Sequence, residues 1–235
     1  MRLHRFYINQ KIGEMGKITL TDSELIHQLI NVFRFKAGDK VILFDGSSFE
    51  YEAEISALSK KEISFNPLVK TQGKDTLNKK NNVSLYLSLI KKSNFELAVE
   101  KCTEIGVTEI HPIISERSEK KDLNLERLNK IVKEASEQSG RVTLPEVFEI
   151  TDLEKAVSQA IKDNKTCVVF HTDVNQTKSP NISNNIAIFI GPEGGWTDKE
   201  MDLFKKNSFQ IHSLGQNVLR AETAAIVAVW KILNN

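Results

Sequence analysis

Hydrophobic and polar positions follow two different periods along this chain, and the change of period divides it into two parts. In the first 70 residues the apolar positions have the spacing of strands, and the runs 40–44 and 48–58 flank Asp45-Gly46, a strong hairpin turn signal. A third strand is expected over 63–69. Before these strands, Thr21-Asp-Ser-Glu24 has the form of a capping box at the start of a helix. The first part therefore predicts a small, strand-rich barrel or half-barrel.

The remainder of the chain alternates short apolar runs with segments of helical spacing. The runs that predict buried strands are 83–90, 109–114, 166–170, 186–190 and 209–214. Helices are expected over 93–105, 125–139, 153–161, from 197 onward and over 221–233, with capping boxes at Ser93-Asn-Phe-Glu96 and Thr197-Asp-Lys-Glu200. Such alternation predicts an α/β fold with a mainly parallel sheet covered on both faces. The polar stretch 72–82 predicts a linker, so we expect domains at 1–72 and 73–235.

Composition and charge add mainly exclusions. The chain has 40% hydrophobic and 27% charged residues, which is normal for a globular protein and excludes wholesale disorder. Its longest apolar run, 224–230, is far shorter than the roughly 20 residues of a membrane span, and its N-terminus lacks a signal core, so we expect a cytoplasmic protein. A net charge of +1 means that any nucleic-acid binding must use a local patch.

Cysteine and histidine usage argues against a metal centre. Only Cys102 and Cys167 are present, too few for a disulfide framework or a zinc site, and each lies in an apolar stretch that predicts a core position. No set of His, Cys, Asp and Glu residues has the spacing of metal ligands. We therefore expect chemistry without a metal.

Two loops follow predicted strands at the edge where open parallel sheets bind ligands. In Gly191-Pro-Glu-Gly-Gly-Trp-Thr197, three glycines remove the Cβ atoms that would separate a ligand from the main chain, although a tight turn would use the same residues. In the second loop, 214–224, Arg220 and Glu222 stand beside a helix N-terminus. Arg220 suits an anion or a polarised carbonyl, and a purely structural Arg220–Glu222 pair is the alternative. Neither loop has the lysine of a phosphate-binding loop, which disfavours a nucleotide hydrolase.

Several polar residues outside these loops are candidates for RNA contact. They are His4, Arg5, Lys91, Arg117, Gln138 and Arg141. Gln138 and Arg141 close a predicted helix, where Arg141 is suited to a phosphate or only to the last carbonyls of that helix. Solvated surface is the alternative for the charged members of this set.

Four motifs, taken in order, resemble the RsmE family of ribosomal small subunit RNA uridine N3-methyltransferases. They are Lys101-x-Thr-Glu-Ile-Gly-Val107, Glu134-Ala-x-Glu-Gln-Ser-Gly-Arg141, Ile190-Gly-Pro-Glu-Gly-Gly195 and Leu214-Gly-x-x-Val-Leu-Arg-Ala-Glu-Thr-Ala224. The opening His4-Arg5-Phe6 is also similar, so the resemblance spans essentially the whole chain. It implies a PUA-like RNA-binding barrel over 1–72 and a SPOUT methyltransferase domain with a trefoil knot over 73–235.

The resemblance also implies an activity and its partners. It implies an enzyme that uses S-adenosyl-L-methionine to methylate N3 of a specific uridine in the 16S ribosomal RNA of the small (30S) subunit, as a homodimer. Because any basic face is only local, we expect the enzyme to recognise its target by RNA shape within the assembled subunit. Carried over by position, the cofactor contacts would be Phe170, His171, Thr172, Ile190, Gly191, Pro192, Glu193, Gly194, Gly195, Leu214, Gly215, Gln216, Asn217, Val218 and Leu219.

For the chemistry we expect three residues at the centre. Arg220 would stabilise the developing uridine oxyanion, and Glu222 or Glu193 would orient Arg220 or accept the N3 proton. Two other classes remain open: a non-catalytic RNA-binding or ribosome-assembly protein of the same fold, and a SPOUT methyltransferase that modifies a ribose 2′-hydroxyl or a tRNA guanine.

Overall fold

The computed structural model describes residues 3–13, 16–77, 81–119, 123–172, 180–181 and 183–234. The chain forms two compact units, Met1–Asn78 with Ser136–Thr143, and Lys79–Ala135 with Leu144–Asn235. The first unit thus extends beyond the predicted boundary at residue 72 and includes a segment that returns from the second half of the chain. Asp75 holds this segment, because its carboxylate accepts hydrogen bonds from the backbone N–H groups of Val142 and Thr143 at 3.2 Å each.

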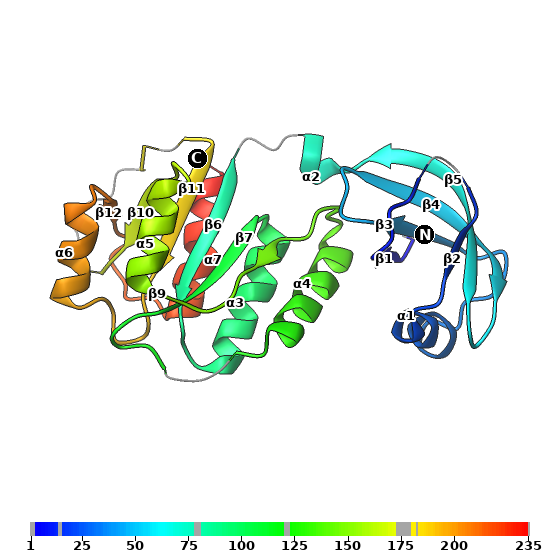
Figure 1. Cartoon of the computed structure of the whole chain (residues 1–235), viewed down its shortest axis with the longest axis horizontal. Helices are drawn as coiled ribbons and strands as arrows, with labels where there is room; N and C mark the ends of the chain where they lie inside the picture. The colour runs from blue at the N-terminus through cyan, green and yellow to red at the C-terminus, as the bar shows by residue number, and fades with distance from the viewer. Residues whose placement is uncertain are drawn as a thin grey trace. The chain divides into compact units, whose positions relative to one another are not determined.

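A five-stranded sheet with the strand order β1-β3-β4-β5-β2 forms the first unit (Figure 1). Its strands are β1 Arg5–Tyr7, β2 Ile18–Leu20, β3 Lys40–Phe44, β4 Phe49–Leu58 and β5 Ile63–Gln72. β3 and β4 are antiparallel and form the predicted hairpin, where Asp45 accepts hydrogen bonds from the N–H groups of Ser47 and Ile12. Alternate side chains of these strands, including Leu43, Ile55 and Phe65, are buried in one core.

The helix of the first unit is capped one residue later than predicted, and its second half is a π-helical turn. α1, Ser23–His27, is capped by Asp22, whose carboxylate accepts from the N–H groups of Glu24 and Leu25. The predicted capping box that starts at Thr21 is therefore wrong, because the Asp22 side chain already satisfies those donors. A π-helical turn, η1 Gln28–Val32, continues α1. The short helix α2, Lys74–Leu77, follows β5 where a linker was expected.

The second unit is built on a parallel sheet, as predicted (Figure 1). Its strands are β6 Asn82–Ser88, β7 Glu109–Ile114, β8 Glu146–Val147, β9 Thr151–Asp152, β10 Thr166–Phe170, β11 Asn185–Ile190 and β12 Gln210–His212. They lie in the order β12-β10-β11-β6-β7-β8, with β9 also paired to β7, and every pairing is parallel. The carboxyl ends of the strands therefore meet at one edge of the sheet.

Helices cover both faces of this sheet, because successive strand side chains point to opposite sides. They are α3 Lys92–Ile105, α4 Leu125–Ser139, α5 Leu153–Lys162, α6 Asp198–Lys206 and α7 Ala221–Leu233. Leu85 and Leu87 of β6 share a core with α3, α4 and α7, whereas Tyr86 faces the core formed with α5 and α6. No helix in the described ranges is long and apolar enough to cross a membrane.

The capping box predicted for α6 is confirmed, and the one predicted for α3 is wrong. α6 begins with the predicted capping box of Thr197 and Glu200. α3 instead begins after Lys91 without a side-chain cap, so the capping box predicted at Ser93 is wrong, because Ser93 already lies inside the helix. Cys102 and Cys167 are free and buried, as predicted, and burial raises the pKa of the Cys167 thiol to about 12.

Candidate active site

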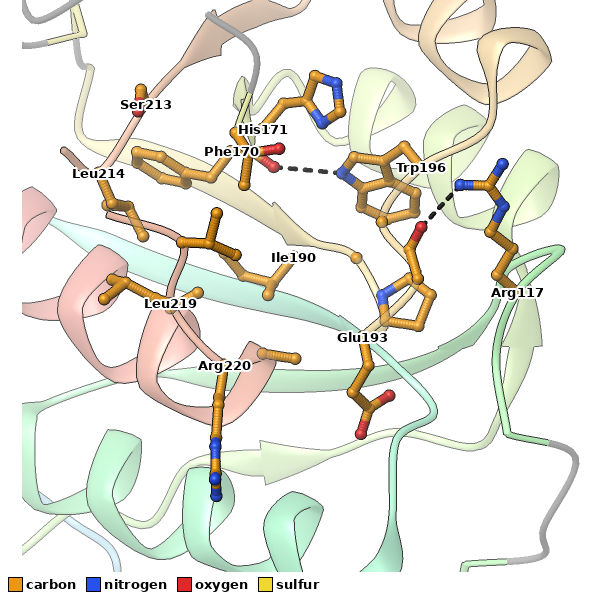
Figure 2. Close-up of a pocket in the computed structure, with 18 of the residues that line it drawn as sticks. Arg117, Phe170, His171, Ile190, Glu193, Trp196, Ser213, Leu214, Leu219 and Arg220 are labelled. Carbon is orange, nitrogen blue, oxygen red and sulfur yellow. Dashed lines mark hydrogen bonds between the residues drawn. The ribbon is translucent and has the colours of Figure 1, made fainter. Parts of the chain in front are cut away.

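A pocket of about 580 Å³ lies at the carboxyl edge of the parallel sheet, where β10, β11 and β12 end (Figure 2). Three loops and the first turn of α7 form most of its walls, and Arg117 and the start of α6 complete them. It brings together all fifteen residues that the resemblance implied as cofactor contacts: Phe170, His171, Thr172, Ile190, Gly191, Pro192, Glu193, Gly194, Gly195, Leu214, Gly215, Gln216, Asn217, Val218 and Leu219. Their assignment to a cofactor stays a prediction, but the fold places them around one cavity.

The glycine loop after β11 exposes main chain to this pocket. The Gly195 N–H donates to the carbonyl of Pro192 at 2.8 Å, and Gly195 has a φ of 67°, a left-handed conformation that favours glycine. A Cβ atom on Gly191 would lie 3.1 Å from the indole ring of Trp196. The glycines therefore allow a tight turn and the close approach of the Trp196 ring.

Trp196 ties the glycine loop to the loop after β10. Its indole N–H donates to the carbonyl of Phe170 at 3.3 Å (Figure 2), and its ring packs edge-on against Phe204 at a centroid distance of 5.0 Å. Trp196 is buried and lines the pocket, although the sequence assigned only residues 190–195 of its motif to the site. Its position directly after those residues, inside the glycine-rich motif, is the signal that could have identified it.

The third loop follows β12, and the side chain of Ser213 stabilises its turn. The Ser213 hydroxyl donates to the carbonyl of Gly215 at 2.9 Å and accepts from the Gly215 N–H at 3.2 Å. This turn ends β12 before residue 214, which makes the strand shorter than predicted. Leu214 and Leu219 are half-buried in the pocket wall, so this loop contributes main chain and two apolar side chains.

Arg117 braces the glycine loop from the segment that follows β7. Its guanidinium donates to the carbonyl of Gly194 at 2.7 Å (Figure 2), and a Cβ atom on Gly194 would lie 3.1 Å from the Arg117 Cδ. The neighbouring Glu116 N–H donates to the carboxylate of Glu200, at the start of α6, at 2.9 Å. Arg117 was predicted to contact RNA, and the structure places it in the wall of the pocket.

The three predicted catalytic residues occupy different environments. Arg220 is the N-cap residue of α7 and Glu193 lies in the glycine loop; both are exposed and line the pocket, and their side chains extend in the same direction in Figure 2. Glu222 is 6% exposed, does not line the pocket and has one carboxylate oxygen, Oε2, without a hydrogen-bond partner in the described structure. No ion pair joins Arg220 to Glu222 in the described ranges, which disfavours the structural pair considered as the alternative.

Two of the predicted RNA contacts are instead buried within the first unit. Arg5 forms an ion pair with Glu50 and donates to the carbonyl of Arg141 at 3.2 Å. The Arg141 guanidinium donates to the Thr143 hydroxyl at 3.3 Å and lies 3.9 Å from Asp75, and burial lowers the pKa of Arg141. In this conformation both side chains hold the returning segment in place. The remaining candidates, His4, Lys91 and Gln138, have exposed side chains.

Comparison with known proteins gives the family. An RNA methyltransferase domain model matches residues 77–233, and an RNA methyltransferase PUA domain model matches residues 20–68. The ribosomal RNA small subunit methyltransferase E of Rickettsia conorii is 35% identical, over 99% of this chain and 96% of its own length. The protein of the same name from Synechocystis is 34% identical, over 92% of this chain and 72% of its own length.

A solved structure agrees with both matches. The ribosomal RNA small subunit methyltransferase E of Neisseria gonorrhoeae, crystallised bound to S-adenosyl methionine, is 28% identical and has a TM-score of 0.86, covering 97% of this chain and 95% of its own. The predicted fold class, a SPOUT methyltransferase domain preceded by a PUA-like domain, is confirmed. This chain belongs to the ribosomal RNA small subunit methyltransferase E family of RNA methyltransferases.

Proposed function

We propose that this protein transfers a methyl group from S-adenosyl-L-methionine to N3 of one uridine in the 16S ribosomal RNA of the small subunit. The observation that carries the proposal is the pocket at the carboxyl edge of the sheet, where the glycine loop and the loops after β10 and β12 meet. The Neisseria relative, which has the same fold over nearly its whole length, was crystallised with S-adenosyl methionine.

The pocket has the chemistry that this cofactor requires. Phe170, Ile190, Leu214 and Leu219 supply apolar walls for a planar base, and the glycine loop supplies main-chain groups for polar substituents. When bound, S-adenosylmethionine supplies a methyl group activated by a sulfonium. No residue has to generate the electrophile, so the protein must orient the uridine, remove its N3 proton and stabilise the charge that remains.

Arg220 and Glu193 are suited to these tasks. Glu193 is exposed at the pocket and accepts the N3 proton, so that the electron pair stays on N3 for the new bond to carbon. The Arg220 guanidinium, which has no ion-pair partner in the described chain, stabilises the negative charge on the uridine oxygens. Glu222 is assigned to neither step, because it is buried outside the pocket.

The proposal includes a homodimer that acts in the cytoplasm, where small subunits are present. Trp230 on α7 is 58% exposed and Val218 in the third loop is 79% exposed, and a second copy would cover such large apolar side chains. Light scattering should give the mass of a dimer for the wild-type protein and that of a monomer for Trp230→Glu. A wild-type monomer at micromolar concentration would contradict the dimer.

The activity is tested by following methyl transfer to isolated small subunits. Subunits from a strain that lacks this modification are incubated with protein and labelled S-adenosylmethionine, and the digested RNA is analysed by mass spectrometry. We expect 3-methyluridine, formed faster on assembled subunits than on naked 16S RNA. A 2′-O-methylated nucleoside or a methylguanine would favour the alternative SPOUT activities, and cofactor binding without any transfer would favour an assembly factor.

A further inference from the structure

Four aromatic side chains of the first unit meet where η1 ends beside β1. The rings of Phe33 and Phe35 stack at a centroid distance of 5.6 Å and an interplanar angle of 21°, and both contact the buried ring of Phe6 edge-on. The imidazole of His4 lies 4.5 Å from the Phe33 ring. His4 is exposed and both Phe33 and Phe35 are half-buried, so part of the cluster faces solvent.

The residue between the two stacked rings has an uncommon conformation. Arg34 has a φ of 58°, in the left-handed region, and the following Phe35 N–H donates to the carbonyl of Leu29 at 3.0 Å to close the end of η1. Glycine is the usual residue at such a helix end, because it adopts this conformation without strain. An arginine here is unfavourable for the backbone, and its side chain is exposed.

Two cations, Arg34 and Lys36, are adjacent in sequence to the phenylalanines of the aromatic cluster. Within the described chain, neither the Arg34 guanidinium nor the Lys36 ammonium has a hydrogen-bond or ion-pair partner, and both side chains are exposed. One carboxylate lies close by, that of Asp39, which accepts the backbone N–H of Lys36 at 2.7 Å. The surface therefore combines half-exposed rings with two cations and one anion.

We propose that His4, Phe33, Arg34 and Phe35 form a stacking site for an unpaired base of RNA, with Arg34 and Lys36 contacting the phosphates beside it. Aromatic rings and arginine planes stack on bases of any sequence, and lysine and arginine attract phosphate. A protein-docking surface would present a larger apolar patch with fewer charges at its centre. The inference rests on the proposed function, since it assigns part of the RNA contact to the first unit.

Binding of single-stranded oligonucleotides by the full chain tests this site without methylation. Fluorescence anisotropy compares a labelled ten-nucleotide oligouridylate with an abasic ten-mer that carries the same phosphates. Phe33→Leu keeps an apolar side chain but removes the ring, and it should weaken oligouridylate binding about 10-fold with little effect on the abasic strand. Arg34→Gly removes the guanidinium, so it should weaken binding to both strands. It also relieves the left-handed backbone, so the melting temperature should stay constant or rise. The control Lys60→Gly removes an exposed cation from the β4–β5 turn and should change neither affinity by more than about 2-fold.

Three results would overturn the stacking site. The first is equal affinity of the wild-type protein for both strands, and the second is unchanged oligouridylate binding by Phe33→Leu. The third is that the variants no longer bind the ribosomal small subunit but still bind oligouridylate, which would assign the surface to a protein partner. If the wild-type protein binds oligouridylate through these residues but makes no 3-methyluridine, the proposed function fails and the stacking site stands.

Discussion

The two edges of the parallel sheet in the second unit use charged residues in opposite ways. At the amino edge, the Glu109 carboxylate accepts hydrogen bonds from Ser84 at 2.6 Å and from His111 at 3.0 Å, and it also pairs with Lys165, whose side chain is 6% exposed. At the carboxyl edge, Arg220 is exposed at the pocket with no ion-pair partner among the described residues. The amino edge satisfies these charges within the protein, while the carboxyl edge leaves Arg220 available to a substrate.

The pairing of charged groups at the amino edge changes the pKa of Glu109. The hydrogen bond from His111, helped by those from Lys165 and Ser84, holds the pKa of Glu109 well below its ordinary value against the opposing effect of burial. The ring of Tyr86 stacks between His111 at 4.2 Å and Phe189, and burial raises the pKa of Tyr86. We infer that the amino edge serves stability and the carboxyl edge serves chemistry, so substitutions at the two edges should have separable effects.

Arg220→Ala should have the largest effect and should act on turnover alone. Removal of one oriented donor to a developing oxyanion lowers turnover about 100- to 1,000-fold, whereas an exposed residue without an ion pair contributes little to folding. Single-turnover methyl transfer and thermal unfolding measure the two effects. Lys206→Ala, at an exposed cation of α6, is the control and should leave both unchanged. Turnover within a few-fold of wild type in a folded Arg220→Ala protein would refute the role of Arg220.

Glu109→Gln should show the reverse behaviour at the amino edge. It leaves the buried Lys165 ammonium with only Asp163, at 3.7 Å, so the free energy of unfolding should fall by about 3 kcal/mol. Under conditions in which the Glu109→Gln variant is folded, its affinity for S-adenosylhomocysteine should equal that of the wild type. Asp152→Asn breaks an exposed pair with Lys155 and should cost less than about 1 kcal/mol in the same urea titration. Equal effects of the two variants would show that the amino-edge network contributes no special stability.

Arg117→Ala should show whether Arg117, at the carboxyl edge, supports cofactor binding or RNA binding. Loss of the charged hydrogen bond to the Gly194 carbonyl should weaken S-adenosylhomocysteine binding about 10-fold. Calorimetry measures this effect, with Arg127→Ala, an exposed arginine of α4, as the control. Unchanged cofactor affinity together with weaker RNA binding would instead support the contact that the sequence predicted for Arg117.

The pH dependence of stability gives the smallest predicted effect. Because the pKa of Glu109 is lower in the folded than in the unfolded protein, its contribution is complete above the ordinary glutamate pKa of about 4.3 and is lost as the pH falls toward the folded value. The stability difference between the wild type and Glu109→Gln should therefore shrink by about 1 kcal/mol per pH unit below pH 4. Urea titrations across this range measure it. A difference that grows as the pH falls below 4 would contradict the network.

Much of the fold could be predicted because its main elements have clear local signals. The predicted bounds of β7, α4, β10 and α7 agree with the structure, since each is a short, mainly apolar strand segment or a regular helical pattern between clear stops. The short strands β1, β2, β8 and β9 were missed, because pairing with strands far away in the chain stabilises them. The helix α2 and the π-helical turn were missed as well. The knot and the dimer came from the family resemblance alone, and they stay predictions.

The site was predictable as a location but less so as a set of contacts. Loops that follow parallel strands lie at one edge of the sheet, so the motifs at 190–195 and 214–219 were expected at the same edge once the strands were recognised. The strand order β12-β10-β11 then brings them to one pocket. The burial of Arg5 and Arg141 and the position of Glu222 outside the pocket depend on packing between residues far apart in the chain. Sequence spacing carries no information about such packing.

The central claim is that the loops at the carboxyl edge hold S-adenosylmethionine, and calorimetric titration with S-adenosylhomocysteine tests it most directly. Gly195→Trp places an indole on the pocket wall, and Gly38→Trp is a matched control at an exposed left-handed glycine of the first unit. We predict that the wild-type protein and Gly38→Trp bind the ligand and that folded Gly195→Trp does not. Absence of binding by the folded wild-type protein, or undiminished binding by Gly195→Trp, would contradict this account.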